Sequence, residues 1–185
     1  YFWSHRQTEF ARDDTQAAVS HYKETFYHRC KLGHYEAAAT TVFACNEFLQ
    51  RRGYYQLLVN LYSQLHTNWQ HSAGQQQNYA AVCNNLGNAY NSLAQYQQAI
   101  AFHQQSLAIT QDIGTCNGEA NSLMNLGNAY KSLGKYQKAI DFYQQSLAIQ
   151  REIGDRNGEA ASLGNLGLAY GSLGQYQQAI DFHQQ

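Results

Sequence analysis

Asparagine side chains recur at helical spacing in the second half of the chain. Two sets follow the i, i+4, i+7 spacing of one helix face: Asn84, Asn88 and Asn91, then Asn121, Asn125 and Asn128. A carboxamide donates through its nitrogen and accepts through its oxygen, so it can pair with both polar groups of a peptide main chain. Asparagine inside a helix costs about 0.6 kcal/mol relative to alanine, because its amide competes for backbone hydrogen bonds. The pattern therefore indicates a surface that binds an extended peptide.

These asparagines belong to a segment that the chain carries three times. It reads NLGNAYNSLAQYQQAI from Asn85, NLGNAYKSLGKYQKAI from Asn125 and NLGLAYGSLGQYQQAI from Asn165. We expect these three residues to form a ladder for a partner's main chain, and the residues expected around them are Asn84, Asn88, Asn91, Asn121, Asn128 and Lys131. An alternative stays open, in which the asparagines reflect a composition rich in Gln and Asn or bond within their own helix.

Other residue types lack the spacing that catalysis or metal binding needs. The cysteines form no C-x-x-C pair, and we expect them to pack between helices: Cys30, Cys45, Cys83 and Cys116. His103 and His183 stand in different repeats and cannot share a metal ion, so packing between repeats is expected for both. Glu119 and Glu159 follow Asn-Gly, which suits the first turn of a helix. We therefore predict no enzymatic activity, no metal and no cofactor.

The composition disfavours two classes of partner. Of the 185 residues, 44% are hydrophobic and 14% are charged, and the net charge is -1. The longest basic cluster is Arg51 and Arg52, which argues against nucleic acid as a partner. The sequence has no run of about 18 apolar residues and no signal-peptide pattern at its start, so we expect no membrane partner and a cytoplasmic location. Because the chain begins at Tyr1 and stops at Gln185 within a repeat, we expect it to be a piece of a longer polypeptide.

The element that must position the asparagines is a helical hairpin. Gly87, Gly127 and Gly167 are 40 residues apart, and a fixed period of about 20 to 50 residues is typical of a solenoid. Apolar residues follow one helix stripe on each side of the glycine-containing turn: Leu123, Leu126, Tyr130 and Leu133, then Tyr136, Ala139, Ile140, Tyr143, Leu147 and Ile149. The sequence thus predicts an all-α fold, an α-solenoid of antiparallel helical hairpins.

The repeated glycines and tyrosines are predicted to serve packing. A glycine inside a helix costs about 1 kcal/mol relative to alanine, so Gly87, Gly127 and Gly167 indicate the close approach of a neighbouring helix. Two sets of tyrosines are expected in the core, with their hydroxyl groups at its edge: Tyr90, Tyr130 and Tyr170, then Tyr96, Tyr136 and Tyr176. Packing thus explains why the glycines and tyrosines recur, but it does not explain the asparagines. We therefore predict that the asparagines bind the partner.

The first 75 residues do not keep the period, although their apolar residues are spaced as in helices. We expect residues 1–75 to form a degenerate lead-in or cap of about three helices. Residues 76–185 are expected to form the array, with two full 40-residue repeats and a truncated third. The polar stretch from His66 to Gln77 is the expected flexible joint.

The repeats resemble the tetratricopeptide repeat (TPR). The family pattern of Leu-Gly-x-x-Tyr, then Ala, then an aromatic residue is present as Leu126, Gly127, Tyr130, Ala139 and Tyr143. The other copies match but carry His103 and His183 in place of the aromatic residue. The period is 40 and not about 34, which is similar to the repeats of kinesin light chains and Pins-type adaptors. The resemblance covers residues 76–185.

The resemblance implies a non-catalytic scaffold that binds a peptide or helix of a partner protein in a concave groove. In Pins-type repeats Asn at these positions serves peptide capture, which supports the proposed ladder. TPR co-chaperones that hold a C-terminal carboxylate use Lys and Arg on the first helices. Here the corresponding places hold Asn84, Met124, Gly164 and Asn165, so a carboxylate clamp is disfavoured.

An alternative function follows from residues 32–65, which look like the helical region that leads into TPR arrays of bacterial STAND-type signalling NTPases. The chain would then be a sensor or autoinhibitory arm of a larger protein. It contains no G-x-x-x-x-G-K-[ST] loop, so the NTPase domain would lie outside it. We also expect the uncapped repeat near Gln185 to allow self-association through its exposed apolar face.

Overall fold

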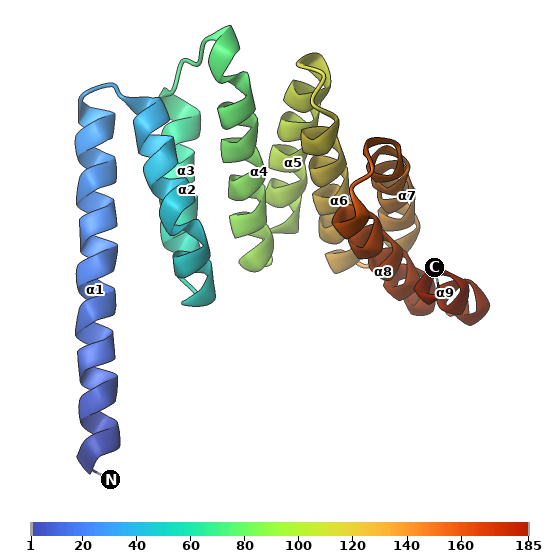
Figure 1. Cartoon of the computed structure of the whole chain (residues 1–185), viewed down its shortest axis with the longest axis horizontal. Helices are drawn as coiled ribbons and strands as arrows, with labels where there is room; N and C mark the ends of the chain where they lie inside the picture. The colour runs from blue at the N-terminus through green and yellow to red at the C-terminus, as the bar shows by residue number, and fades with distance from the viewer. Residues whose placement is uncertain (1, 185) are drawn as a thin grey trace. The chain divides into compact units, whose positions relative to one another are not determined.

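Helices form the regular secondary structure of the computed structural model, which describes the backbone of residues 2–184 and the side chains of residues 15–184. The helices are α1 (Phe2–Lys31), α2 (Tyr35–Arg51), α3 (Tyr55–Asn68), α4 (Gln76–Ser92), α5 (Tyr96–Asp112), α6 (Cys116–Ser132), α7 (Tyr136–Ile153), α8 (Arg156–Ser172) and α9 (Tyr176–His183) (Figure 1). A 3-10 turn, Ala73–Gln75, precedes α4. Residues 2–184 contain no strand, which confirms the predicted all-α class.

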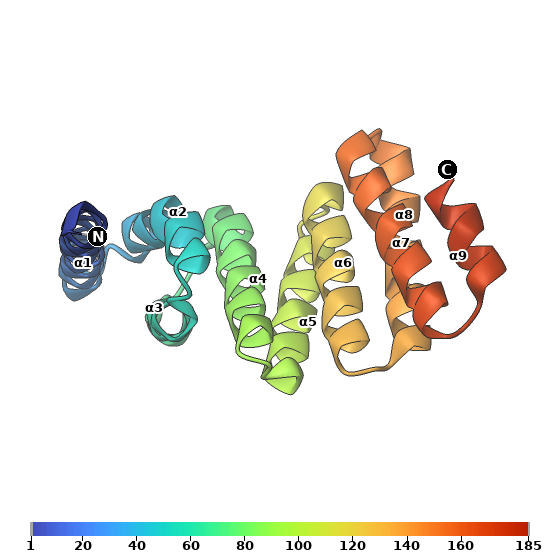
Figure 2. The same cartoon turned by 90° about the horizontal axis from the view of Figure 1, so that it is seen from below.

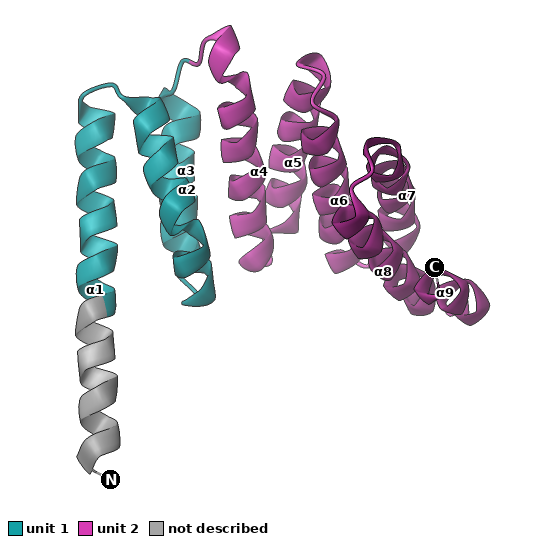
Figure 3. Cartoon of the chain, in the orientation of Figure 1, with its two compact units in different colours: residues 1–70 teal, residues 71–185 magenta. Residues whose placement is uncertain are grey.

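The chain divides into two compact units, residues 1–70 and residues 71–185 (Figure 3). The first unit contains α1, α2 and α3, and α2 packs on both of its neighbours. Residues at helical spacing are buried there: Val19, Phe26, Cys30, Ala38, Val42, Cys45, Leu49, Leu58, Leu61, Tyr62 and Leu65. The Tyr62 hydroxyl donates to Asn46 Oδ1 at 3.1 Å and joins α3 to α2. No helix within residues 2–184 is long and apolar enough to cross a membrane.

The second unit consists of three helical hairpins that follow one another along the chain. They are formed by α4 with α5, α6 with α7, and α8 with α9 (Figure 2). The second helix of each hairpin packs on the first helix of the next, α5 on α6 and α7 on α8. Buried Ile140 and Tyr143 of α7, for example, share a core with Leu163 and Leu166 of α8. This packing confirms the predicted solenoid.

Each hairpin closes around a glycine and a ring. A Cβ atom at Gly127 would lie 2.4 Å from the Tyr143 ring, and one at Gly87 would lie 2.6 Å from the His103 ring. The same contact recurs between Gly167 and His183, at 2.5 Å. These distances confirm close helix approach at the three glycines. They also correct the expectation for the histidines, because each ring packs within its own hairpin.

The tyrosines on the first helices stack on phenylalanines of the second helices. The ring centroids of Tyr90 and Phe102 are 5.4 Å apart, and those of Tyr130 and Phe142 are 5.3 Å apart, with the planes nearly parallel. Tyr170 stacks in the same way on Phe182. Tyr176 departs from its predicted place in the core and is 71% exposed, because no described helix packs beyond α9.

The turn inside each hairpin uses a residue with a positive φ angle. Gly134 has φ 71°, and the next residue, Lys135, donates its N–H to the Tyr130 carbonyl at 2.9 Å. A bond of this span, from a residue to the carbonyl five positions earlier, is typical of a helix C-terminus that ends in a residue with left-handed backbone conformation. Ala94 takes the same place in the first hairpin with φ 57°. It is the one non-glycine residue with positive φ among the described residues.

Candidate functional site

The predicted binding residues lie on the first helices of the hairpins, α4, α6 and α8. Asn121 is exposed, whereas the other members are half-buried: Asn84, Asn85, Asn88, Asn91, Asn125, Asn128, Lys131 and Asn165. A half-buried amide can contact both the protein and a ligand, so the hydrogen bonds of each side chain decide what remains available for binding.

A network of three side chains joins the first two hairpins. Asn84 Oδ1 of α4 accepts from Asn125 Nδ2 of α6 at 3.0 Å. The same oxygen is 2.9 Å from His103 Nδ1 of α5, which donates to it as the N–H tautomer. Burial of the His103 side chain, which is 1% exposed, lowers its pKa from 6.5 to about 4. The imidazole is therefore neutral at physiological pH.

Two further predicted binding residues, Asn128 and Asn165, form hydrogen bonds with side chains of other helices. The Tyr143 hydroxyl donates to Asn128 Oδ1 at 2.8 Å, so this amide fixes the ring that packs on Gly127. Lys131 Nζ donates to Asn165 Oδ1 at 3.2 Å and lies 5.9 Å from the centre of the Tyr143 ring. Desolvation lowers the pKa of Lys131. The oxygens of Asn84, Asn128 and Asn165 thus have partners inside the protein.

The remaining asparagines differ in what they leave available. Asn121 Nδ2 donates to Asn117 Oδ1 at 3.4 Å on the same helix. The side chains of Asn85 and Asn88 make no hydrogen bond within the described part of the chain. Asn91 Oδ1 is buried and has no hydrogen-bond partner among the described residues. The structure therefore brings together Asn84 with Asn125 and Lys131 with Asn165, but it does not join the three predicted ladder residues to one another.

These interhelical bonds are a role that the sequence pattern did not assign. The open alternative placed the asparagine bonds within a single helix, and only the pair of Asn121 and Asn117 follows it. Asn84 with Asn125, and Lys131 with Asn165, instead connect successive hairpins. One sequence signal for these bonds was available. The repeat with His103 at its aromatic position also has an amide at Asn84, whereas the next repeat has Tyr143 together with Met124.

A pocket of about 410 Å³ opens between α4 and α6 beside two of the predicted residues. It was not expected from the sequence. Its polar lining comes from α4, α5 and α6 and includes Gln77, Asn84, Thr110, Asn117, Asn121 and Ser122. Ser106 and Ser122, which also line the pocket, share a hydrogen bond of 2.9 Å, and Ser106 also donates to the Ala80 carbonyl at 3.0 Å.

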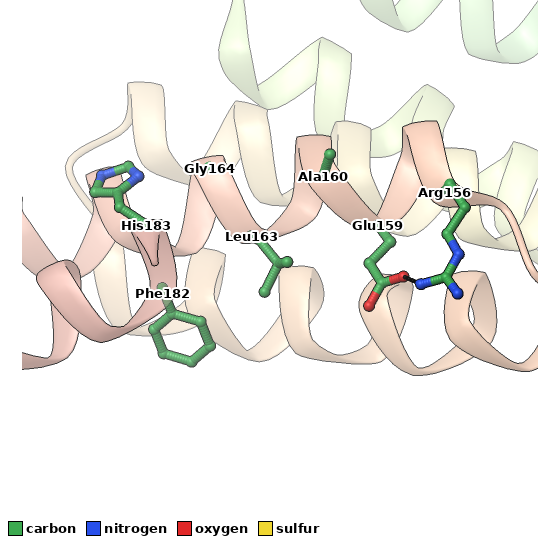
Figure 4. A pocket seen from close by; sticks show the side chains of 7 residues that line it. All are labelled: Arg156, Glu159, Ala160, Leu163, Gly164, Phe182 and His183. Atoms are coloured by element: carbon green, nitrogen blue, oxygen red, sulfur yellow. Dashed lines mark hydrogen bonds and ion pairs between the residues drawn. The ribbon is translucent and has the colours of Figure 1, made fainter. Parts of the chain in front are cut away.

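A second pocket, of about 380 Å³, lies between α8 and α9 (Figure 4). Arg156 Nη1 donates to Glu159 Oε2 at 3.4 Å along one wall, and Leu163 and Phe182 supply its apolar part. The hydrogen bond from Arg151 Nε, 2.8 Å long, is the main cause that lowers the pKa of Glu159. Glu159 thus lies in the first turn of α8 as predicted, and there it also joins α8 to α7.

The described residues contain no group of three or more His, Cys, Asp or Glu side chains that could hold a metal ion. Cys45 and Cys83 are buried, and desolvation raises the pKa of the Cys45 thiol to about 11 and that of Cys83 to about 12. Thiols with such pKa values are weak nucleophiles at neutral pH. Cys30 is also buried, whereas Cys116 is exposed and departs from the expectation that it packs between helices.

Comparison with known families identifies the repeats. Models described as tetratricopeptide repeat match residues 80–113 and residues 118–185. The chain belongs to the tetratricopeptide repeat family. No curated protein matches the sequence.

Solved structures with the same fold share little sequence with this chain. BtubC (BKLC) from P. vanneervenii is 19% identical, with a TM-score of 0.76 over 92% of this chain and 71% of its own. A Podosopora anserina kinesin light chain with nearly identical TPR-like repeats is 22% identical, with a TM-score of 0.68 over 94% of this chain and 86% of its own. The apo form of RapI is 18% identical, with a TM-score of 0.77 over 95% of this chain and 48% of its own.

These comparisons place the chain in a class of helical repeat scaffolds. Tetratricopeptide repeats are generally protein-binding scaffolds and not catalysts. The solenoid of α4 to α9 has the architecture of that class. The chain is accordingly a TPR scaffold for protein–protein interaction.

Proposed function

We propose that the chain binds an extended peptide segment of a partner protein along the faces of α4, α6 and α8 that carry Asn85, Asn125 and Asn165. The observation that carries the proposal is the availability of amide groups at this repeated position. Asn85 makes no hydrogen bond within the described part of the chain, and Asn165 Nδ2 makes none there because its bond to Lys131 uses the oxygen. Each free group can pair with a main-chain N–H or C=O of the peptide.

The charges near these residues favour main-chain recognition over the capture of a charged group. No Lys or Arg occurs between Arg52 and Lys131. Lys131 already donates to Asn165. A peptide carboxylate would therefore find little positive charge on α4 or on the start of α6, whereas neutral main-chain groups would find amides.

Replacement of all three asparagines by alanine tests the proposal. A peptide selected on the unmodified protein from a random-sequence display library serves as the probe. We expect Asn85→Ala, Asn125→Ala and Asn165→Ala together to weaken its binding at least about tenfold, since each lost hydrogen bond contributes roughly 1 kcal/mol. Calorimetric titration measures the affinity, and circular dichroism checks that helicity is kept.

The matched control removes three exposed amides with the same 40-residue period from the second helices: Gln97→Ala, Gln137→Ala and Gln177→Ala. This variant should bind the peptide as the unmodified protein does. Undiminished binding after removal of the three asparagines would show that they do not form the peptide site.

A second candidate keeps the same surface but changes the partner. The degenerate turn segments at Gly33 and Gly53, each with positive φ, lead from one helix to the next in the first unit. Their resemblance to the region before TPR arrays of signalling NTPases favours a sensor or autoinhibitory arm. The test is the coding sequence upstream of Tyr1: a phosphate-binding G-x-x-x-x-G-K-[ST] loop there would support this candidate.

A further inference from the structure

Thr110 of α5 lines the pocket between α4 and α6. The residue 40 positions later, Gln150 of α7, is 1% exposed, and its Oε1 accepts from the Ser162 hydroxyl at 2.6 Å. The buried side chain at this position is thus longer in the following repeat than in the repeat of Thr110.

Thr110 and Gln150 share a glycine and a serine among their neighbours, whereas Asn84 and Thr115 near Thr110 correspond to Met124 and Asp155 in the following repeat. A Cβ atom at Gly118 would meet Thr110 at 2.7 Å, and one at Gly158 would meet Gln150 at 2.7 Å. Ser122 stands where Ser162 stands in the following repeat, and both serines are buried. Thr110 is therefore a position at which a longer side chain is compatible with the same neighbouring glycine and serine.

The pocket is lined by no charged side chain, and amide and hydroxyl groups alternate there with apolar residues such as Ala80 and Ala81. Asn84 Nδ2 and Asn121 Oδ1 are available to a ligand there, because Asn84 bonds within the protein through its oxygen and Asn121 through its nitrogen. Among its surroundings, the ionisable Glu119 already accepts from Gln111 Nε2 at 2.9 Å on α5. A buried charge without a partner is strongly unfavourable, whereas a neutral polar side chain can hydrogen bond with amides and hydroxyls.

We infer that this pocket is a specificity subsite that accepts one uncharged amide or hydroxyl side chain of the bound peptide. The inference rests on the proposed function, because Asn84 and Asn121 border both the pocket and the proposed path of the peptide main chain. The position of the side chain along the peptide would fix the register of the partner on the repeats.

A reciprocal exchange tests the subsite. Thr110→Gln should narrow the pocket because glutamine is the larger side chain, and the fold should tolerate it because Gly118 and Ser122 match Gly158 and Ser162 beside Gln150. Random-sequence peptide libraries are selected on the unmodified protein and on this variant. We expect the unmodified protein to select a recurrent Asn, Gln, Ser or Thr, and its selected peptide to bind Thr110→Gln about five to ten times more weakly, as for one lost neutral hydrogen bond.

The controls separate the subsite from the site as a whole. A peptide with Ala at the recurrent position should bind both proteins equally, and Gln150→Thr should leave the binding of the selected peptide unchanged. Thermal melting of Thr110→Gln verifies the fold. If the selected residue is charged or apolar, or if Thr110→Gln binds the selected peptide with unchanged affinity, the subsite is wrong while peptide binding stands. If no peptide binds either protein, the proposed function fails and the subsite fails with it.

Discussion

His103 shows at the residue scale how one substitution within a repeat changes the physical chemistry of a hairpin. Its ring takes the place that Tyr143 has in the next repeat and packs on Gly87 as Tyr143 packs on Gly127. Unlike a tyrosine ring, an imidazole can become charged in mildly acidic solution. Because burial lowers the pKa of His103 to about 4, the folded state resists this protonation.

The stability of the protein should consequently fall in acid. Between the unfolded pKa of 6.5 and the folded pKa of about 4, the unfolded chain binds the proton more readily than the folded chain. The stability that neutral His103 contributes is therefore fully present above pH 6.5 and is lost as the pH falls toward 4. The free energy of unfolding should fall by about 3 kcal/mol over this range. Urea denaturation of the unmodified protein and of His103→Tyr at pH 7 and pH 4 measures it.

His103→Tyr restores the residue of the next repeat, and the required acceptor is present because Asn88 stands where Asn128 accepts from Tyr143. We expect this variant to fold and to lose less stability in acid than the unmodified protein, by roughly that same 3 kcal/mol. The other histidines are common to both proteins, so their effects cancel in the comparison. Equal losses in the two proteins would contradict the buried, neutral state of His103.

The sequence predicted the packing residues better than the asparagine bonds. Leu126, Ala139 and Ile140 are buried as the helix stripes indicate, because a stripe depends only on the geometry of its own helix. The bond from Asn125 to Asn84 joins residues 41 positions apart and depends on how α4 and α6 are offset along their axes, which no local pattern encodes. The pocket at Thr110 was missed for a related reason, since its lining is assembled from three helices that only the tertiary fold brings together.

At the scale of the element, the turn of the first hairpin differs from the others. Ala94 has φ 57°, whereas Gly134 and Gly174 have the same left-handed conformation without the steric cost of a Cβ atom. This conformation costs a residue such as alanine about 1–2 kcal/mol. The α4–α5 hairpin therefore contains backbone strain that the α6–α7 hairpin lacks.

Ala94→Gly should relieve that strain. The gain is reduced by the greater freedom of glycine in the unfolded chain, so we expect the free energy of unfolding to rise by about 0.5–1 kcal/mol. Gly134→Ala is the matched control and should lower it by a similar amount, because a Cβ atom there meets nothing within 4 Å and only the backbone is strained. Denaturant titration measures both. A loss of stability in Ala94→Gly would contradict this account.

For the whole molecule, the open face of the last hairpin sets the behaviour in solution. Ile180 is 48% exposed, whereas its counterparts Ile100 and Ile140 are 7% and 1% exposed. Leu168 and Tyr176 add to the exposed apolar surface on α8 and α9. In the preceding repeats the equivalent of Ile180 is covered by the first helix of the next hairpin.

We predict that this face causes weak self-association. Sedimentation velocity should show a mass that rises with protein concentration, and Ile180→Lys should reduce that rise because a charge opposes burial of the face. Leu32→Lys serves as the control, since Leu32 is 55% exposed in the other unit. Association that Leu32→Lys abolishes and Ile180→Lys leaves intact would assign the contact to the first unit.

The recurrence of interface contacts has a consequence for how such a protein can change its length. Arg151 of α7 donates to Glu159 of α8 as Gln111 of α5 donates to Glu119 of α6, and Ile140 packs with Leu166 as Ile100 packs with Leu126. Each hairpin therefore offers the following one nearly the surface that it received itself. Unequal recombination between such similar coding segments would add or delete one complete hairpin and leave the remaining junctions compatible. The span available to a partner would then grow or shrink in steps of one repeat.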